Sequence, residues 1–539
     1  ERVFPERLGP ARTDRKPHEP RITHDPDMPH GCCVSDVRVR GGTCTLAHGI
    51  DDDCKTDAAH GGTLCGRPLA GLPARTGMPA RAIWGRNPHT LWHARIHPVE
   101  RKGHRQHVRW MMDGSDAPAA WKRARKLSFA DLMRLADPER TAREDLVNHH
   151  LPRQARAPLD RARIAAGSEA LAASAASRAR ERARALSAVG DAIAGGLSLP
   201  PAVRRFGVRR DQAVWASAPV RIDLAGGWSD TPPLCIEHGG CVVNVAVKLG
   251  GTLPVQAMVR VTDEPTVSVH SVDAGRTGRY ASVRELLAHD DPARWDALPK
   301  AAIVLSGLVP RDPGASLRRH LERAGGGVAV TLFSAVPRGS GLGPSSILGA
   351  TLLAALARVA GRAASRDRIA ASAALLEQTI RTRGGWQDQV GGLWGGFKRC
   401  APRAGGRQVP AGSPIAVPDR LDASLRARTL LVFSGKRRMA RGILETVVLR
   451  YLRGEPAVLD ARERLVEGAE AMAVALRTGD AEAFVDRLDE YRHLKATVDP
   501  ASVSNDLTGR VASMGRGVEA WSPAGAGGGG FLYVVFREP

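Results

Sequence analysis

The sequence predicts a mixed α/β fold for residues 213–539, and three observations carry that prediction. Apolar runs at 241–247, 266–272 and 327–333 have the length and composition of buried strands. The run 347–359 is apolar over helical length and directly follows a glycine-rich segment. Three stretches with helical apolar spacing, 438–452, 457–477 and 481–495, precede a final strand at 533–536.

The regions before residue 213 differ from one another in composition and in the pattern of apolar residues. Residues 1–30 are rich in Pro, Arg, His and Asp, which predicts a disordered leader. Residues 31–110 are glycine-rich with short alternating runs, which predicts a β-rich segment. Ala, Arg and Glu dominate 168–188, and we expect residues 111–212 to form a helical linker.

Composition excludes several classes of protein. The chain has 539 residues, of which 43% are hydrophobic and 25% charged, as in ordinary globular proteins. No apolar run reaches the roughly 18 residues that a membrane span needs, so no membrane partner is expected. The net charge of +22 raises the question of nucleic acid. No dense basic block alternates with aromatic residues, so we expect no specific nucleic-acid binding. The oligomeric state stays open.

The cysteines favour free thiols over a metal site. There is no CxxC pair, and His93 and His97 have HxxxH spacing without paired cysteines before them. The chain starts at Glu1 with no secretory pattern. We therefore expect reduced thiols and a cytoplasmic location.

A glycine-rich loop at 337–346 stands between a predicted strand and a predicted helix. Glycines let backbone N–H groups approach phosphate oxygens, and the helix N-terminus adds partial positive charge. Ser345 or Ser346 can offer a hydroxyl to Mg²⁺. The loop has neither the Walker lysine nor the dinucleotide spacing. The alternative is a structural turn capped by serine.

Two further segments favour a phosphate site. Glu377 and Asp388 are eleven residues apart, and phosphoryl transfer needs one carboxylate for Mg²⁺ and one that faces the acceptor hydroxyl. The alternative for each is a surface carboxylate. The glycine-rich run 525–530 precedes the last predicted strand, which favours a packed turn beside a ligand over a flexible tail.

Together these segments resemble the GHMP kinase superfamily. Its first motif is similar to residues 218–230, its second to 337–346 and its third to 525–530. Within the superfamily the L-fucokinases are closest, through 221–233, 384–389 and 434–440. The resemblance implies a two-lobed α/β fold, with an N-terminal domain at 213–400 and a ferredoxin-like C-terminal domain at 401–539. It also implies ATP and Mg²⁺ as cofactors and a sugar as the second substrate.

The resemblance assigns roles residue by residue. Asp388 falls at the catalytic aspartate, and Arg221 is expected beside it and the γ-phosphate. The metal ligands are Ser345 and Glu377. The sugar-binding set is Asp230, Trp228, Gly227, Gly527 and Gly528. The ATP-binding set is Pro337, Gly339, Ser340, Gly341, Leu342, Gly343, Ser345 and Ser346. One departure stands at Pro344, where fucokinases usually have threonine, and proline lacks the N–H and the hydroxyl.

The implied reaction converts L-fucose to L-fucose 1-phosphate, a step of fucose salvage toward GDP-fucose. Gly227 and Trp228 replace the Glu-His of galactokinases, and an indole face suits the methyl group of a 6-deoxy sugar. Trp228 also favours fucose over heptose, because heptose kinases tend to have glycine there. The alternatives are D-arabinose, L-galactose or a manno-heptose as substrate, or a degenerate sugar-binding pseudokinase. A core tryptophan is the other interpretation of Trp228.

The region before the kinase motifs carries a second resemblance. Segments 48–55, 64–69 and 91–99 are similar to the region preceding the kinase in bifunctional fucokinase/GDP-fucose pyrophosphorylases. There a nucleotidyltransferase domain ends in a left-handed β-helix, so residues 31–110 are expected to be a short β-helix-like remnant. No GxGxR loop precedes residue 31, and pyrophosphorylase activity is not expected.

Overall fold

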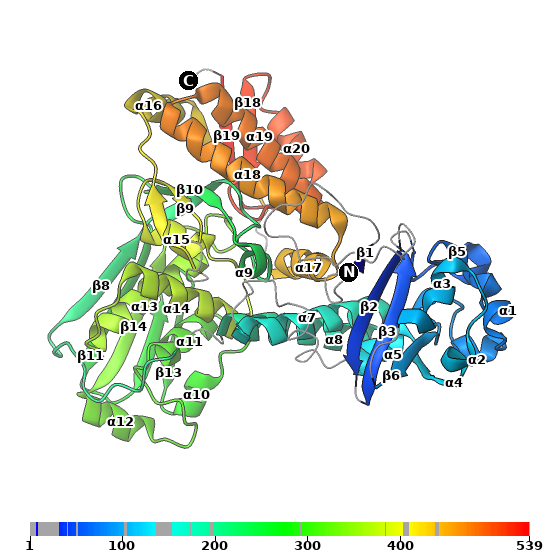
Figure 1. Ribbon diagram of the computed structural model, residues 1–539. Helices are drawn as coiled ribbons and strands as arrows, with labels where there is room; N and C mark the ends of the chain where they lie inside the picture. Colours follow the sequence, from blue (N-terminus) through cyan, green and yellow to red (C-terminus); the bar gives the residue numbers. More distant parts are fainter. Residues whose placement is uncertain are drawn as a thin grey trace. The chain divides into compact units, whose positions relative to one another are not determined.

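The computed structural model describes most of the chain. The described residues are 7–8, 32–39, 41–49, 52–101, 105–135, 153–172, 174–194, 198–291, 293–382, 384–402, 409–436 and 441–537. They divide into a first unit, residues 1–188 and 452–454, and a second unit, residues 189–451 and 455–539 (Figure 1). The predicted leader lies outside the described residues, apart from Arg7–Leu8, which forms a short strand.

The first unit contains an antiparallel sheet of order β1-β2-β3-β6-β7. Its strands are β1 (Arg7–Leu8), β2 (Cys32–Val39), β3 (Gly42–Gly49), β6 (His97–Glu100) and β7 (Arg125–Leu127). A separate small pair is formed by β4 (Thr63–Leu64) and β5 (Arg67–Pro68). A β-helix stacks parallel strands, whereas the described strands here pair antiparallel. The described residues therefore do not show the expected β-helix-like remnant.

Short helices complete the first unit. They are α1 (Leu72–Thr76), α2 (Ala80–Trp84), α3 (Arg109–Asp113), α4 (Ala119–Arg123) and α5 (Phe129–Leu135). Their buried tryptophans Trp84, Trp110 and Trp121 join the strands in one hydrophobic core. This core extends to Leu132, beyond the domain boundary predicted near residue 110. Two long helices follow, α7 (Arg153–Leu171) and α8 (Ala175–Ala194).

The second unit begins with a five-stranded sheet of order β13-β12-β14-β11-β8. The strands are β8 (Ala213–Ala218), β11 (Val255–Thr262), β12 (Val267–Ser271), β13 (Arg276–Tyr280) and β14 (Gly327–Ser334). The apolar helix α13 (Pro344–Val359) packs on β8, β11 and β14. Around it lie α10 (Val283–Leu287), α11 (Ala297–Leu305), α12 (Leu317–Ala324) and α14 (Arg366–Thr379) (Figure 1).

A second sheet carries the segment that becomes the site. Its order is β16-β15-β10-β9, with β9 (Val220–Ala225), β10 (Val242–Val247), β15 (Phe397–Cys400) and β16 (Gly412–Pro414). Pro219 separates β8 from β9, where the chain passes between sheets. All six residues of β9 are buried, because α15 (Gln387–Leu393), α18 (Pro456–Thr478) and α19 (Ala481–Val498) also contact it. The short helix α9 (Leu234–His238) lies between β9 and β10 along the chain.

The C-terminal part has a three-stranded antiparallel sheet of order β17-β19-β18. It consists of β17 (Thr429–Phe433), β18 (Val518–Pro523) and β19 (Phe531–Phe536), with helices α16 (Asp419–Arg428), α17 (Arg441–Leu452) and α20 (Asn505–Ala512) nearby in sequence. The predicted strands and helices of residues 213–539 are confirmed to within a few residues at their ends. The ferredoxin-like topology of 401–539 stays a prediction, since the described part of this sheet has three strands.

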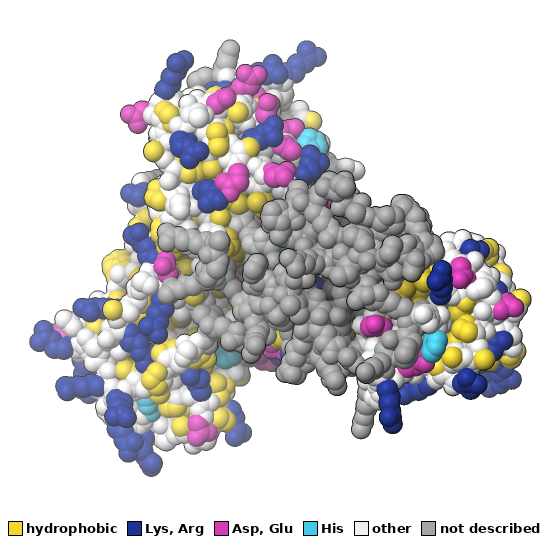
Figure 2. Space-filling view, in the orientation of Figure 1, with side chains coloured by type: hydrophobic (Ala, Val, Ile, Leu, Met, Phe, Trp, Pro, Cys, Tyr) yellow, Lys and Arg dark blue, Asp and Glu magenta, His cyan; other side chains and the backbone are white. Residues whose placement is uncertain are grey.

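Within the described residues, no helix is long and apolar enough to cross a membrane. On the face shown in Figure 2, Lys and Arg side chains are spread over both the five-stranded sheet and the C-terminal helices, with acidic side chains among them.

Candidate active site

A cavity of about 450 Å³ opens in the second unit, where the segments singled out in the sequence, 218–230, 337–346 and 525–530, meet. It is bounded by the turn after β9, the loop before α13, the start of α15 and the glycine-rich turn between β18 and β19. The predicted site residues that line it are Arg221, Gly227, Trp228, Asp230, Gly339, Gly341, Gly343, Ser345, Ser346, Glu377, Asp388 and Gly527.

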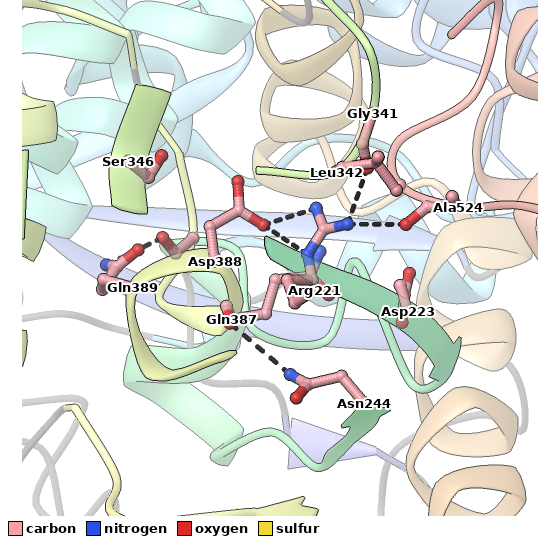
Figure 3. Close-up of polar contacts among 12 residues, drawn as sticks. Arg221, Asp223, Asn244, Gly341, Leu342, Ser346, Gln387, Asp388, Gln389 and Ala524 are labelled. Atoms are coloured by element: carbon pink, nitrogen blue, oxygen red, sulfur yellow. Dashed lines mark hydrogen bonds and ion pairs between the residues drawn. The ribbon is translucent and has the colours of Figure 1, made fainter. Parts of the chain in front are cut away.

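The Arg221 guanidinium holds three of these segments together. Its Nε donates to Oδ1 of Asp388 at 2.8 Å, and Nη2 donates to the same oxygen. Its Nη1 donates to the carbonyls of Gly341 and Ala524, each at 2.6 Å (Figure 3). One buried cation thus joins β9, α15, the loop before α13 and the turn after β18.

Charge pairing offsets the burial of Arg221. Its side chain is 3% exposed, whereas that of Asp388 is 25% exposed and lines the cavity. Burial alone would lower the pKa of Arg221, but the charges of Asp388 and Asp223 raise it, and the net shift is upward. The pair therefore places a carboxyl group that is hydrogen-bonded to a guanidinium at the cavity wall.

A second carboxylate, Asp230, is buried beside the first. Its Oδ2 accepts from the backbone N–H of Gln387 at 3.1 Å. Its Oδ1 has no hydrogen-bond partner among the described residues. Burial raises the pKa of Asp230 to about 7, helped by the neighbouring charges of Asp388 and Asp223. A Cβ at Gly385 would lie 2.0 Å from Oδ2, so only glycine leaves room for this carboxylate.

A third buried carboxylate, Asp223, belongs to a network that crosses from β9 to α19. The Tyr491 hydroxyl donates to Asp223 Oδ2, and Lys495 Nζ lies 3.2 Å from the same oxygen. Lys495 also donates to the carbonyls of Pro523 at 2.8 Å and Gly525 at 2.9 Å. Burial lowers the pKa of Lys495, and burial with Asp223 raises that of Tyr491. Asp223 Oδ1 has no partner within the described residues.

Glu377 lies in the same cavity at the end of α14. Its Oε1 accepts from the Ser346 hydroxyl at 2.6 Å, and its Oε2 accepts from the Thr382 hydroxyl. Burial raises the pKa of Glu377. The hydroxyl that reaches Glu377 is thus that of Ser346, whereas Ser345, the predicted ligand, is exposed on the cavity wall.

The loop 337–346 presents glycines at the cavity wall and is held in place by buried residues. Gly343 has φ of 73° and caps α13 with no side-chain hydrogen bond, so the first-turn N–H groups meet the cavity without a side-chain cap. Ser340 and Leu342 are buried and do not line the cavity. Their carbonyls accept from Phe531 N and Arg221 N, so they hold the loop in place. Pro337 and Gly528 also lie outside the cavity lining.

Trp228 follows Gly227 in the turn after β9. Its backbone has φ of 79°, which is rare for a residue with a side chain and is often a mark of functional sites. The indole is buried against Leu444, Val447 and Tyr491, yet it also lines the cavity. Its Nε1 has no partner among the described residues. Trp228 is therefore both a core residue and a wall of the site.

The sequence singled out neither Asp223 nor its partners on α19. Asp223 lies in the first motif, two residues after Arg221. On a strand this spacing places both side chains on the same face, and it was the signal that could have identified Asp223. Tyr491 and Lys495 are four residues apart on one helix face, which reads as ordinary packing. Thr382 had no signal of its own, and Gly385 lies in the segment 384–389 but had no role assigned to it.

No group of three or more His, Cys, Asp or Glu side chains able to hold a metal occurs in the described part of the chain. The oxygen donors around Glu377 nevertheless suit Mg²⁺, which is commonly held by one or two carboxylates and keeps several waters. Hydroxyl and carboxylate oxygens are its preferred ligands.

Comparison with known proteins gives a consistent picture. Residues 314–396 match the family model of the GHMP kinases N terminal domain. The chain is 33% identical over 356 residues to the L-fucokinase/L-fucose-1-P guanylyltransferase of Bacteroides fragilis, covering 65% of this chain and 37% of that protein. It is 33% identical over 324 residues to the bifunctional fucokinase/GDP-fucose pyrophosphorylase of Arabidopsis thaliana, covering 59% and 29%.

A shorter relative matches along most of its length. The D-glycero-alpha-D-manno-heptose 7-phosphate kinase of Campylobacter jejuni is 25% identical over 331 residues, covering 61% of this chain and 90% of the relative. A solved D-glycero-D-manno-heptose 1-phosphate kinase is similar at 19% identity, a TM-score of 0.43 and coverage of 60% and 89%. The matched part of the chain therefore spans only about a third of the length of each of the first two relatives, 37% and 29%.

Proposed function

We propose that this chain, which carries the N-terminal domain of the GHMP kinases at residues 314–396, is an ATP-dependent sugar 1-kinase. The observation that carries the proposal is the Arg221–Asp388 pair at the wall of a cavity that also contains an uncapped helix start. A phosphate chain suits the helix start, and a hydroxyl acceptor suits the exposed carboxylate.

The reaction assigns one role to each partner of the pair. The sugar hydroxyl bonds to the γ-phosphorus as the bond to the bridging oxygen of ADP breaks, and its proton passes to Asp388. Arg221 holds Asp388 in place through its hydrogen bonds and stabilises negative charge near the transferred group. Because such transition states are loose, positioning and charge carry more of the catalysis than proton abstraction.

The residues around Glu377 fit a Mg²⁺ ion bound with ATP. Glu377 and the hydroxyls of Ser345 and Ser346 are the groups that would hold it. When bound, Mg²⁺ neutralises phosphate charge and orients the nucleotide. The chain supplies an oxygen set that is already turned into the cavity.

Buried acceptors without partners support a polyhydroxylated substrate. Asp223 and Asp230 line the cavity, and Oδ1 of each is buried and lacks a partner in the described residues. An unpaired buried carboxylate oxygen is costly, and a sugar hydroxyl would supply the missing donor. The unpartnered Trp228 Nε1 adds one donor to the same wall.

L-Fucose is the sugar that we propose. The identity of 33% to two fucokinase-containing proteins and the Gly227-Trp228 pair both favour it. Position 227 carries no carboxylate, in contrast to the glutamate of galactokinases. The structure also leaves no room for a side chain there, because a Cβ at Gly227 would lie 2.2 Å from the Tyr491 hydroxyl. The wall beside the substrate is therefore apolar indole, which suits a methyl group. Trp228→Gly should reduce the preference for L-fucose over a manno-heptose; an unchanged preference would show that the indole does not select the sugar.

A manno-heptose is the second candidate substrate, because the Campylobacter heptose-phosphate kinase matches this chain along 90% of its own length. ADP release with Mg·ATP should be measured with L-fucose, D-arabinose, L-galactose, D-galactose and a manno-heptose. We expect turnover with L-fucose that disappears in Asp388→Asn. Turnover with the heptose alone would identify the heptose as the substrate. An absence of turnover with every sugar, in folded protein, would favour a degenerate sugar-binding kinase.

A further inference from the structure

Arg338 stands at the junction of two cavities. It belongs to the loop 337–346 and lines the 450 Å³ cavity that holds Asp388. It also lines a smaller neighbouring cavity of about 80 Å³. The walls of this second cavity are mostly apolar and include Trp295, Leu298, Leu348 and Ile380.

Among the described residues, three cations line the larger cavity, and two of them are already engaged. Arg221 donates to Asp388 and to two backbone carbonyls. The three contacts of Lys495, with Asp223 and two carbonyls, match the three protons of its ammonium group. Arg338 is exposed, and its guanidinium has no hydrogen bond or ion pair with any described residue. Of the described cations that line the cavity, Arg338 is the one with all its donors available.

The charge balance of the cavity favours an additional cation for the binding of a nucleotide. In the described part of the chain, four carboxyl groups line the cavity against these three cations: Asp223, Asp230, Glu377 and Asp388. A polyphosphate would therefore enter a wall that is already acidic. The loop has no Walker lysine, so the backbone N–H groups and the start of α13 contribute partial charges only.

We propose that Arg338 binds the phosphate chain of the nucleotide, between a base seated in the smaller cavity and a γ-phosphate directed at Asp388. The inference rests on the proposed kinase function. An arginine suits this position, because its planar fork donates to two phosphate oxygens at once. Since these phosphates carry their charge before and during transfer, the contact strengthens nucleotide binding more than it accelerates the chemical step.

The test measures binding of Mg·ADP and of adenosine by calorimetry, without any sugar. Arg338→Ala is expected to weaken Mg·ADP binding about tenfold, as for loss of a hydrogen bond to a charged group. Adenosine, which lacks phosphate, should bind both proteins equally. Arg338→Lys should recover part of the loss, because it keeps the charge without the fork. Arg319→Ala is the matched control, since Arg319 is an exposed arginine of α12 that lines neither cavity.

The outcomes separate this inference from the proposed function. Equal Mg·ADP binding by Arg338→Ala and the unmodified chain would overturn the role of Arg338 and leave the kinase proposal standing. An equal loss for ADP and adenosine would also overturn it, because that result indicates a disturbed loop. If the unmodified chain binds neither nucleotide, the proposed function fails and this inference fails with it.

Discussion

Arg221 Nε lies 2.8 Å from Asp388 Oδ1, although the two residues are 167 positions apart in the chain. The arginine is buried in β9, and the aspartate stands in the first turn of α15 with a quarter of its side chain exposed. The hydrogen bonds fix the carboxylate in a single orientation, with one oxygen occupied by the guanidinium. The other oxygen of Asp388 is left for an acceptor hydroxyl.

Asp388→Asn removes the charge and keeps the shape. We expect kcat for sugar phosphorylation to fall by about 10²–10⁴-fold, the usual contribution of a positioned acid or base, while Mg·ADP binding stays within a few-fold. Steady-state kinetics and calorimetry measure the two effects. Asp486→Asn is the control, since Asp486 is an exposed aspartate on α19. A variant with normal kcat would exclude Asp388 from the reaction.

Asp230 makes the stability of the free protein depend on pH. Its pKa is raised from 3.8 to about 7 by burial, so the folded state binds this proton more tightly than the unfolded state does. The carboxyl therefore lowers stability progressively as pH rises from about 4 to 7. Asp230→Asn should raise the midpoint of thermal unfolding by about 2 °C or more at pH 8, with a smaller gain at pH 5.

The same substitution should remove sugar phosphorylation, because the amide replaces an acceptor oxygen that has no protein partner. Thermal melts at the two pH values, with Asp486→Asn alongside, isolate the buried carboxyl from general charge effects. A gain that is larger at pH 5 than at pH 8 would contradict the raised pKa.

Gly385→Ala tests the room around Asp230. The added Cβ would lie 2.0 Å from Asp230 Oδ2, so the carboxylate or the backbone must shift. We expect the KM for the sugar to rise at least about tenfold, in line with the sensitivity of reactions to displacements of about 1 Å. Gly395→Ala is the control, because its Cβ would meet nothing within 4 Å. Equal sugar KM values for the two variants would argue against contact between Asp230 and the sugar.

Ser345 and Ser346 are alternative candidates for the hydroxyl that serves the Mg²⁺ site, and one pair of variants distinguishes them. The family resemblance places the metal-binding hydroxyl at Ser345, whereas the hydroxyl in contact with Glu377 is that of Ser346, at 2.6 Å. If Ser346 holds Glu377 in its metal-binding position, Ser346→Ala should raise the Mg²⁺ concentration needed for half-maximal activity by about tenfold. Ser345→Ala should raise it equally or more if Ser345 ligates the ion. If neither variant changes this Mg²⁺ concentration, the metal does not bind at this loop.

Pro344 begins α13 and is buried. Its ring removes one N–H from the phosphate loop. Pro344→Thr should lower the apparent KM for ATP about threefold to tenfold, the range for one added neutral hydrogen bond. Pro344→Ala restores the N–H without the hydroxyl and divides the two contributions. An unchanged KM in both variants would mean that neither group reaches the nucleotide.

Local pattern predicted the second unit far better than the first. The apolar runs at 241–247 and 347–359 became β10 and α13, because length and apolar composition decide such elements without tertiary help. In residues 31–132, short helices and strands share one tryptophan-rich core. The alternating runs predicted strands there, but they did not indicate how the strands pair, and the short helices carry no clear periodicity that would mark the end of the core.

The candidate site was predicted where glycine motifs mark it and missed where tertiary contacts create it. Arg221, Asp388 and Glu377 stand in or near motifs and all line the cavity. The Asp223–Tyr491–Lys495 network depends on α19 packing against β9. A tyrosine and a lysine one helical turn apart give no sign that they meet a carboxylate 268 residues away.

The hydrogen bond from Arg221 to the Ala524 carbonyl, across 303 residues, has a consequence for the order of folding. A guanidinium that is buried before its acceptors arrive is strongly unfavourable. Packing of the earlier residues of the second unit around β9 therefore adds little stability until the segment that contains Ala524 has been synthesised and has docked. Contacts of such long range form slowly. During biosynthesis the ability to bind substrate should therefore be among the last properties that this chain acquires.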